Sequence, residues 1–490
     1  MMEPIMLLTL GGGGPLFHQV FRAAREAILS GRVRAGERLP VTRALARELG
    51  VSRNVVLIAY EQLIAEGYAE GRVGSGTYVA ATVPEAMTRA AARSKAGGAE
   101  GPGETRLSRY GSRILADPES DAPLTTAGRR TRYDFAYYLS RGEDFPAPLW
   151  RQLLSRRLRR LELDYAAVQG DSGLRREIAR YLRRTRGIEC TAEQVLLVNG
   201  SQQAMDLVGR VLLDAGDRVV MENPHYTGAR EVFRAVGARI VPVAVDEQGI
   251  DVEQLPRSAR LAYVTPSHQF PTGAILPLDR RLALLSWAER NQAYILEDDY
   301  DGEYRYEGRP VEAVQAMDRT GRVVYTGSFS RVLFPSLRMG YLVAPRALAG
   351  ALAKAKWIAD RHTSFLQQAA LADLMREGHL DRLVRRARVR NAARREALLR
   401  ALERDFGDAV EVRGAAAGVH VLACFPKLTA GDTASLVEAA AKAGVRVYST
   451  AHYYLGAAPR CELLLGYGAM SEREIAAGVR MLAVALGQRR

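Results

Sequence analysis

Residues that could bind a phosphate group and a charged aromatic ring lie at the ends of predicted strands in the second half of the sequence. In NGSQQAMDL a strand meets a helix at Gly200, so the backbone amides near Ser201 and Gln202 could hold a phosphate at the helix N-terminus. Tyr226 could stack on a ring, and Asp298 could face a protonated ring nitrogen. Each feature alone has a plainer explanation, because such junctions are common, a tyrosine can lie on a rim and an aspartate can belong to a solvated loop.

A second group of polar residues, near the N-terminus, suits contact with nucleic acid. Ser52, Arg53 and Asn54 occupy the first turn of a predicted helix and are not needed by its apolar face. Arg53 could form paired hydrogen bonds with guanine, and Asn54 could pair with adenine or bond a phosphate. The complete set of expected DNA contacts is Thr42, Arg43, Arg47, Ser52, Arg53, Asn54, Arg72, Gly74, Ser75, Gly76 and Thr77. Any one of these arginines could instead belong to a solvated helix face.

Three helices and a β-hairpin are predicted to position these DNA contacts. Apolar residues recur at helical spacing within 15–31, 38–50 and 51–67, and Thr42 and Ser52 are the expected N-caps of the second and third helices. YAEGRVGSGTYVA then predicts two short strands around a glycine turn. This order of elements predicts a winged helix-turn-helix, with the third helix as the recognition helix.

The segment GERLPVTRALARELGVSRNVVLIAYEQLIAEGYAEGRVGSGTYV resembles the GntR-type winged helix over its whole length. The pattern is long and specific, from G-x-R-L-P through the L-A-x-x-L-G-V-S-R-N run to G-S-G-T-Y-V. The resemblance implies that this part of the chain binds double-stranded DNA.

The sequence divides into four segments by composition and periodicity. Residues 1–80 form the DNA-binding domain, and residues 81–130, rich in Ala, Gly, Pro, Ser and charges, are expected to be a flexible linker. From residue 131 onward, helices alternate with the apolar runs VLLVNG, DRVVMEN, RIVPVAV, RLAYVTP, AYILEDD and RVVYTGS. This alternation predicts an α/β fold with a mostly parallel sheet in residues 131–350 and a smaller C-terminal α+β subdomain in residues 351–490.

Composition indicates a cytoplasmic protein with an anionic partner. The net charge is +14, although residues 1–80 contribute little of it, with nine Arg and seven Glu. Cys190, Cys424 and Cys461 are too widely spaced to indicate a disulfide framework or a metal site. Neither a membrane span nor a cleaved leader is expected, because no run of eighteen apolar residues is present and MMEPIMLLTL lacks a charged start and a cleavage site.

Three later segments, TPSHQFPTG, EDDYDGEYRY and SFSRVLFPSLRMGYLVAP, occur in the order found in fold-type I aminotransferases. The chain as a whole, from about residue 15, resembles the MocR-type regulators, which join a GntR-type winged helix to an aminotransferase-like domain. In such proteins the second domain usually senses pyridoxal phosphate (PLP), alone or with an amine, and the chains often form head-to-tail dimers. The resemblance therefore implies a DNA-binding transcriptional regulator that binds a small-molecule effector and operator half-sites as a homodimer.

The resemblance also implies which residues surround the cofactor. Matched by motif, these are Ser201 and Gln202 near the phosphate, Tyr226 stacked on the ring, His268 beside it, Asp298 at the ring nitrogen, Tyr300 near the ring hydroxyl, Ser328 and Arg338 at the phosphate, and Arg331 at the lysine position. The rigid fork of an arginine matches phosphate oxygens.

Arg331 stands where the family has the lysine that forms a Schiff base with PLP. A lysine amine can deprotonate and attack an aldehyde, whereas a guanidinium cannot. We therefore expect ordinary aminotransferase activity to be lost and PLP, if bound, to be held non-covalently. Lys354 and Lys356 fall on a following helix and are not expected to reach the site. Leu464 and Leu465 stand where an arginine for the substrate carboxylate would be sought.

Three functions remain open at this level. The retained phosphate residues favour a regulator that senses PLP or another anion. Only five of the 69 Lys and Arg residues are lysines, so drift from lysine to arginine could also have produced Arg331 in a regulator whose vestigial domain serves dimerisation. An active aminotransferase would need a nucleophile that the loop lacks. We favour the first, because drift would be expected to erode Asp298, Tyr300 and Arg338 as well.

Overall fold

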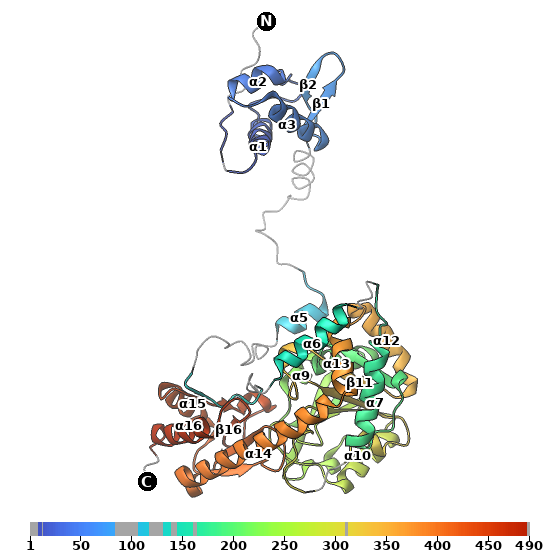
Figure 1. Cartoon of the computed structure of the whole chain (residues 1–490), viewed down its shortest axis with the longest axis vertical. Coiled ribbons are helices and arrows are strands. Elements are labelled where there is room, and N and C mark those ends of the chain that lie inside the picture. The colour runs from blue at the N-terminus through green and yellow to red at the C-terminus, as the bar shows by residue number, and fades with distance from the viewer. Residues whose placement is uncertain are drawn as a thin grey trace. The chain divides into compact units, whose positions relative to one another are not determined.

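The chain forms two compact units, an N-terminal unit (Met1–Arg106) and a C-terminal unit (Leu107–Arg490), which are described separately below (Figure 1). The computed structural model describes residues 8–11, 13–83, 106–116, 131–138, 145–159, 164–308 and 312–487. The segment MMEPIMLLTL, expected not to be a cleaved leader, lies mostly outside this range. Among the helices described, none is both long and apolar enough to cross a membrane.

The N-terminal unit contains three helices followed by a β-hairpin. Its elements are α1 (Leu16–Leu29), α2 (Thr42–Glu48), α3 (Arg53–Ala65), β1 (Ala69–Arg72) and β2 (Gly76–Val79). The two strands pair antiparallel, and the inner faces of all five elements share one apolar core around Val20, Leu45, Val56 and Leu63. This order of elements confirms the predicted winged helix-turn-helix.

The helix caps of this unit agree with the sequence at one position and differ at another. Ser52 is the N-cap of α3, and its hydroxyl accepts a hydrogen bond from the Val55 amide at 3.4 Å, as predicted. The predicted cap of α2 is wrong, because Val41 occupies that position and Thr42 is the first helical residue. The Thr42 hydroxyl accepts instead from Nε of Arg53 at 3.4 Å, so it connects the two helices of the helix-turn-helix.

The C-terminal unit is built around an eight-stranded sheet in the order β4-β11-β10-β9-β8-β5-β6-β7. Its strands are β4 (Val195–Val198), β5 (Arg218–Asn223), β6 (Arg239–Asp246), β7 (Gly249–Ile250), β8 (Leu261–Val264), β9 (Tyr294–Asp299), β10 (Val323–Ser328) and β11 (Gly340–Val343). The strands from β10 to β6 are parallel, whereas β11 and β7 run antiparallel to their neighbours. All six predicted apolar runs form strands of this sheet, which confirms the mostly parallel α/β fold.

Helices cover both faces of the large sheet. They are α6 (Ala147–Leu158), α7 (Ser172–Arg186), α8 (Ser201–Leu212), α9 (Thr227–Val236), α10 (Leu278–Arg290), α11 (Val314–Met317), α12 (Arg346–Asp360) and α13 (Phe365–Arg376). Side chains alternate along a strand, so Val219 and Met221 of β5 pack on the face of α8 and α9, while Val220 packs on the face of α10. Continuous apolar strands follow from this double coverage.

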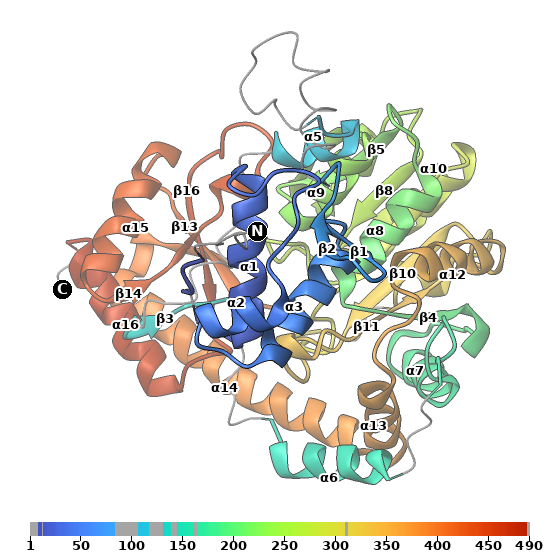
Figure 2. The same cartoon turned by 90° about the horizontal axis from the view of Figure 1, so that it is seen from above.

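A smaller antiparallel sheet, in the order β12-β13-β16-β15, forms the second core of the unit. Its elements are α14 (His379–Phe406), β12 (Glu411–Arg413), β13 (His420–Phe425), α15 (Thr433–Lys442), β14 (Val445–Arg446), β15 (Tyr448–Ser449), β16 (Cys461–Gly466) and α16 (Glu472–Ala485), and β3 (Tyr133–Asp134) pairs with β14. In Figure 2 these C-terminal elements lie on one side of the unit, and β4, α7 and α12 lie on the other.

The packing places the division inside this unit differently from the predicted boundaries at 130/131 and 350/351. The helices α12 and α13 bury Leu352 and Leu371 against the large sheet and its helices, although they follow residue 350. Tyr133 and Phe135 lie in the core of the small sheet, although they precede the large one. Periodicity reveals that a helix is amphipathic but not which of two neighbouring cores receives its apolar face.

A helix also lies in the segment 81–130 that we predict as a flexible linker. It is α5 (Arg109–Leu115), whose N-cap Ser108 accepts a hydrogen bond from the Gly111 amide at 3.1 Å. Nε of Arg113 donates to the carbonyl of Ala235 at 2.9 Å, which attaches this helix to the C-terminal end of α9. The predicted linker therefore contains a docked helix, while its residues 84–105 and 117–130 lie outside the described part of the chain.

The turn before β13 packs tightly on the end of the large sheet and provides a test of this packing. Gly418 has φ +79°, and a methyl group there would overlap the His268 ring. Gly216 has φ +100°, with open space around it. We expect Gly216→Ala to destabilise the unit by about 1 kcal/mol through backbone strain alone. Gly418→Ala should cost at least ~2 kcal/mol more, because it adds steric overlap to the same strain.

Urea unfolding followed by tryptophan fluorescence measures both variants. Trp150, Trp287 and Trp357 are the only tryptophans of the sequence and all lie in the C-terminal unit, so the signal reports that unit alone. Equal losses for the two variants would show that the turn is free to move away from His268.

Candidate functional site

A cavity of about 180 Å³ lies at the carboxyl ends of the parallel strands of the large sheet. Ligand sites of open α/β sheets form at this edge, because the loops that follow parallel strands converge there. The cavity is lined by Tyr137, Tyr138, Ser201, Tyr226, Tyr263, Thr265, Phe270, Asp298, Tyr300, Ser328, Ser330, Arg331, Pro335 and Arg338. The structure thus brings together seven of the nine predicted cofactor residues.

Asp298, at the end of β9, is the buried acid of the cavity. It is 4% exposed, and its Oδ2 accepts a hydrogen bond from the Tyr263 hydroxyl at 2.8 Å. Its Oδ1 is buried without a hydrogen-bond partner among the described residues. Burial raises the pKa of the carboxyl to about 7, opposed by the Tyr263 hydrogen bond and the Arg331 charge and reinforced by Asp299 and Asp301. An unpaired carboxylate oxygen in such a place is costly and available to a ligand.

Tyr300, two residues after Asp298, lines the cavity, and its hydroxyl contacts a buried polar cluster of His268, Asp301 and His420. Nδ1 of His268 lies 3.0 Å from the Tyr300 hydroxyl and 2.9 Å from Oδ2 of Asp301. His420 lies next to His268, with ring centroids 4.8 Å apart, and the donor atoms of both histidines and Asp301 lie within 4.8 Å of one another. His268 therefore supports Tyr300 instead of forming part of the cavity wall, where the sequence placed it.

The opposite end of the cavity offers donors for an anion. The helix α8 begins at Ser201 without a side-chain cap among the described residues, so its first amides are open to a ligand. Nη2 of Arg338 donates to the carbonyl of Asn199 at 2.9 Å, and a methyl group on Gly200 would lie 2.7 Å from the same atom. The Ser328 hydroxyl donates to Ser330 Oγ at 2.8 Å. These hydroxyls, amides and guanidinium converge as a phosphate site requires.

Arg331 lies between these two ends. Its Nη1 donates to the carbonyl of Tyr137 at 2.7 Å, and its own carbonyl accepts from the Tyr304 hydroxyl at 3.0 Å. No lysine lines the cavity among the residues that the structure describes. Lys356, on α12, is fully buried and bonds Asp360 and Gln203, outside the cavity wall.

Several residues of the cavity were missed from the sequence. Tyr137, Tyr138 and Phe270 come from irregular segments, and their rings pack against one another and against Tyr226 in T-shaped or tilted contacts. No periodic pattern announces them, but Phe270 lies within the quoted TPSHQFPTG segment. Gln202 was predicted for the phosphate, yet its side chain donates to the Gly228 carbonyl at 2.9 Å and does not line the cavity.

The predicted recognition helix presents polar residues to solvent in the N-terminal unit. Arg43, Arg47, Ser52, Arg53 and Asn54 are all exposed, whereas Val56, Ala59 and Leu63 of α3 are buried in the core. The exposed set therefore comes from α2 and from the first turn of α3. A helix-turn-helix uses these positions for the backbone and bases of DNA.

The hairpin presents a second exposed group. The Arg72 guanidinium lies 4.5 Å from the Tyr78 ring centroid, and the Ser75 hydroxyl lies 2.6 Å from the Tyr78 hydroxyl. Gly74 and Gly76 have φ angles of +75° and +116°. Arg38, from the G-x-R-L-P motif, was not among the predicted contacts, yet a methyl group on Gly76 would lie 2.9 Å from its Nε. Arg38 and the hairpin tip form one surface.

Comparisons with known proteins match each of the two units to a family. Residues 137–476 match the family described as aminotransferase class I and II, and residues 16–79 match the bacterial regulatory proteins of the gntR family. The class of protein is therefore a regulator in which a DNA-binding domain is joined to an aminotransferase-like domain. The chain belongs to the MocR-type transcriptional regulators.

Full-length relatives and a solved enzyme support this assignment. The chain is 38% identical to the probable rhizopine catabolism regulatory protein MocR of Rhizobium meliloti, over 98% of this chain and 95% of that protein. It is 30% identical to the pyridoxine biosynthesis transcriptional regulator PdxR of Corynebacterium glutamicum, over 93% and 92%. LysN, an α-aminoadipate aminotransferase from Thermus thermophilus whose structure holds N-(5'-phosphopyridoxyl)-L-leucine, has a TM-score of 0.69 at 31% identity, covering 78% of this chain and 97% of that one.

Burial of Asp298 makes the stability of the ligand-free C-terminal unit depend on pH. With a folded pKa near 7 and an ordinary value of 3.8, Asp298 keeps its proton in the folded protein at pH values where the unfolded chain has lost it. As the pH rises between these two values, the contribution of Asp298 lowers the free energy of unfolding by up to about 1.4 kcal/mol per pH unit. We expect Asp298→Asn to stabilise the ligand-free C-terminal unit, with a gain that grows between pH 4 and pH 7 and then levels off.

Urea unfolding at several pH values, followed by tryptophan fluorescence, measures this gain. Asp214→Asn serves as the control, because Asp214 is exposed and does not line the cavity. A gain for Asp298→Asn that is the same at pH 5 and pH 8 would contradict the assigned burial cost.

Proposed function

We propose that the aminotransferase-like domain of this regulator binds PLP non-covalently as an effector and has no aminotransferase activity. The aminotransferase class I and II domain is a PLP-binding family. The observation that carries the proposal is the unpaired Oδ1 of Asp298. It lies in a cavity that is also lined by Ser201, Ser328 and Arg338, the residues proposed for the phosphate, and by Arg331, proposed for the lysine position.

The residues present fit this cofactor. Asp298 would pair with the ring nitrogen, because its free oxygen has no other partner among the described residues. The amides at the start of α8, the hydroxyls of Ser328 and Ser330, and Arg338 would hold the phosphate. When bound to a lysine, PLP supplies an electron sink for amine chemistry. Here the guanidinium of Arg331 can donate hydrogen bonds and positive charge to the ligand but cannot form a covalent bond with it.

The position at which an arginine for the substrate carboxylate would be sought also departs from what an aminotransferase needs. Leu464, on β16, is fully buried in an aromatic cluster with Tyr137, Phe270 and Tyr453. A carboxylate placed there would lose its water without gaining a cation. The apolar position therefore favours a receptor for the cofactor over a reaction centre for an amino acid.

For the N-terminal unit we propose that α3 enters the major groove while the hairpin reaches the adjacent backbone or minor groove. Two such units in a head-to-tail homodimer would contact two operator half-sites. Ligand in the C-terminal unit would bias the arrangement of the dimer, by no more than its difference in affinity for the two states. We place this activity in the cytoplasm, where DNA is accessible and the three free cysteines stay reduced.

The first test compares the wild type with Arg331→Lys. The wild type should retain PLP after gel filtration with the absorbance of a free aldehyde. The variant should show the absorbance of lysine-linked PLP, which sodium borohydride makes permanent. Arg338→Gln and Asp298→Ala should each weaken retention, by about ten-fold or more, because each removes a charged partner.

The matched control is Arg473→Gln, on α16, which should leave retention unchanged. Loss of PLP by the wild type under conditions in which Arg331→Lys retains it would overturn the proposal of a live non-covalent site. A lysine-linked spectrum in the wild type would overturn the role given to Arg331.

The second test concerns DNA, with duplexes selected from a random pool by the full chain. Arg53→Ala should relax preference at one base pair and cost about 1–3 kcal/mol on the selected duplex. Arg43→Ala should weaken binding to all duplexes alike and lower the salt slope by about one.

Fluorescence anisotropy across a salt series separates the two effects, and Arg22→Ala on α1 serves as the control. Base preference that survives Arg53→Ala intact would show that the first turn of α3 does not read bases.

A further inference from the structure

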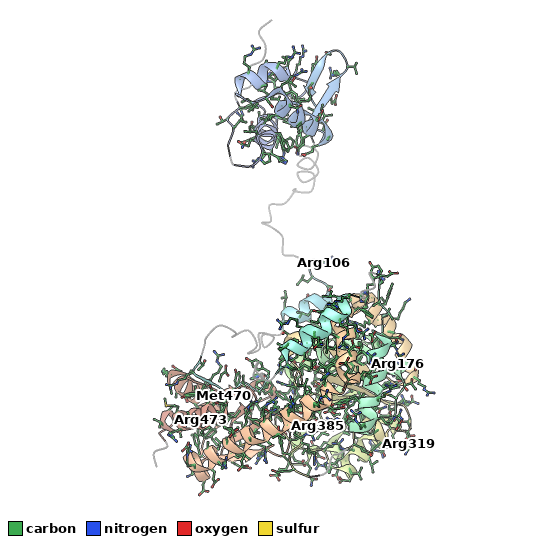
Figure 3. The ribbon with its side chains drawn as sticks, in the orientation of Figure 1. Arg106, Arg176, Arg319, Arg385, Met470 and Arg473 are labelled. Carbon is green, nitrogen blue, oxygen red and sulfur yellow. The ribbon has the colours of Figure 1, made fainter. Side chains whose placement is uncertain are left out.

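A second cavity, of about 530 Å³, lies in the C-terminal unit away from the cofactor cavity. It is formed by the C-terminal end of α7, the loop after β9 and the first half of α14, and none of its described lining residues lines the cofactor cavity. Its lining includes five arginines, namely Arg184, Arg186, Arg305, Arg385 and Arg388, and two acidic residues, Glu303 and Asp381. Figure 3 labels Arg385 on α14.

Two of the five arginines are neutralised by carboxylates. Arg184 donates from Nη2 to both oxygens of Asp381, at 2.7 and 2.8 Å. Arg186, whose side chain is only 11% exposed, pairs with Asp299 at 2.7 Å. These two arginines therefore hold the walls of the cavity together and contribute little net charge to it.

The other three arginines have no ion pair with any carboxylate in the described part of the chain. Arg388 donates from Nε to the backbone carbonyl of Glu303 at 3.0 Å, which leaves its charge uncompensated. Arg385 is exposed. Nε of Arg305 is buried without a hydrogen-bond partner among the described residues, and burial lowers the pKa of this guanidinium.

The remaining acid does little to balance this charge. Glu303 accepts a hydrogen bond from the Tyr181 hydroxyl at 3.0 Å and forms no ion pair within the described residues. Burial raises the pKa of its carboxyl, and the charge of Arg186 partly offsets this shift. Because five arginines and only two acids line the cavity, positive charge dominates it.

An arginine-rich chain could produce such a cluster without a ligand. Elsewhere in this unit, however, an arginine that lines another cavity forms an ion pair. Arg280 is partly exposed and lies 2.6 Å from Asp246. Uncompensated guanidiniums repel one another, and a buried N–H without an acceptor costs free energy. Three arginines without an ion pair among the described residues, on the loop after β9 and on α14, therefore line one cavity and suit an anionic ligand.

We propose that this cavity binds a small organic anion with two or more negative charges, whose carboxylate or phosphate oxygens are held by Arg305, Arg385 and Arg388. The planar forks of these side chains match both kinds of oxygen. One residue connects this site with the cofactor cavity, because Tyr304 lines the arginine cavity and its hydroxyl bonds the carbonyl of Arg331 at 3.0 Å.

The test is calorimetric titration of the full chain with citrate, malonate and pyrophosphate at low salt. We expect saturable binding of at least one of them, with the response to citrate against pyrophosphate separating carboxylate from phosphate recognition. Arg385→Gln and Arg388→Gln should each weaken it about ten-fold or more, because each removes a charge-assisted contact. Arg385 is exposed, so its variant is expected to fold normally.

Two further variants locate the site. Arg338→Gln changes the phosphate end of the cofactor cavity and should leave citrate binding intact, and Arg473→Gln removes one charge on α16 with no expected effect. Three outcomes overturn the proposal. They are the absence of saturable binding at millimolar anion, loss of binding in Arg338→Gln with no change in Arg385→Gln, and equal weakening by Arg473→Gln, which would indicate a response to net charge alone.

Discussion

The cavity of the C-terminal unit is organised around the cost of burying Asp298. A carboxyl at the end of a central strand, with three further acids (Glu297, Asp299 and Asp301) within three residues, is unfavourable in its charged form, as its pKa of about 7 indicates. Only one of its oxygens is compensated by the fold, through Tyr263. The acid is held there by its strand, because β9 is buried in the middle of the eight-stranded sheet, between β10 and β8. The uncompensated oxygen is a ready-made partner for a cationic ring nitrogen.

Arg331 alters the chemistry of this cavity without removing its electrostatics. Burial raises the pKa values of Asp298 and Tyr226, and the charge of Arg331 partly offsets both shifts, as a protonated lysine would. Its hydrogen bond to the Tyr137 carbonyl holds the guanidinium in the cavity wall. What is lost is the ability to shed a proton and attack an aldehyde. With the proposed phosphate end, ring-nitrogen partner and fixed cation, but no nucleophile, the domain would recognise its ligand and release it unchanged. Reversible recognition is what a regulator requires of an effector site.

The sequence predicted which helices and strands form better than it predicted which of them pack together. Apolar runs and strand–glycine junctions located every parallel strand and the carboxyl-end residues Ser201, Asp298 and Ser328, because strand direction alone brings them to one edge. It could not place Tyr137 or Phe270, whose positions depend on how irregular segments from distant parts of the chain pack together. The sequence places His268 beside the ring, but the structure places it behind Tyr300, outside the cavity wall. A sequence motif does not show whether a side chain lines a cavity or supports a residue that does. For the same reason the sequence predicts linker where α5 forms, since this seven-residue helix buries no residue of its own and docks on α9 through Arg113.

The helix α9 links the cavity to the segment that leads toward the DNA-binding unit. Its first residue, Thr227, directly follows Tyr226 in the cavity wall, and the carbonyl of Ala235 near its other end accepts the hydrogen bond from Arg113 of α5. A ligand can influence a distant domain only through elements whose arrangement both sites affect. The ten residues of α9 therefore join Tyr226, in the cavity wall, to the point at which α5 is docked.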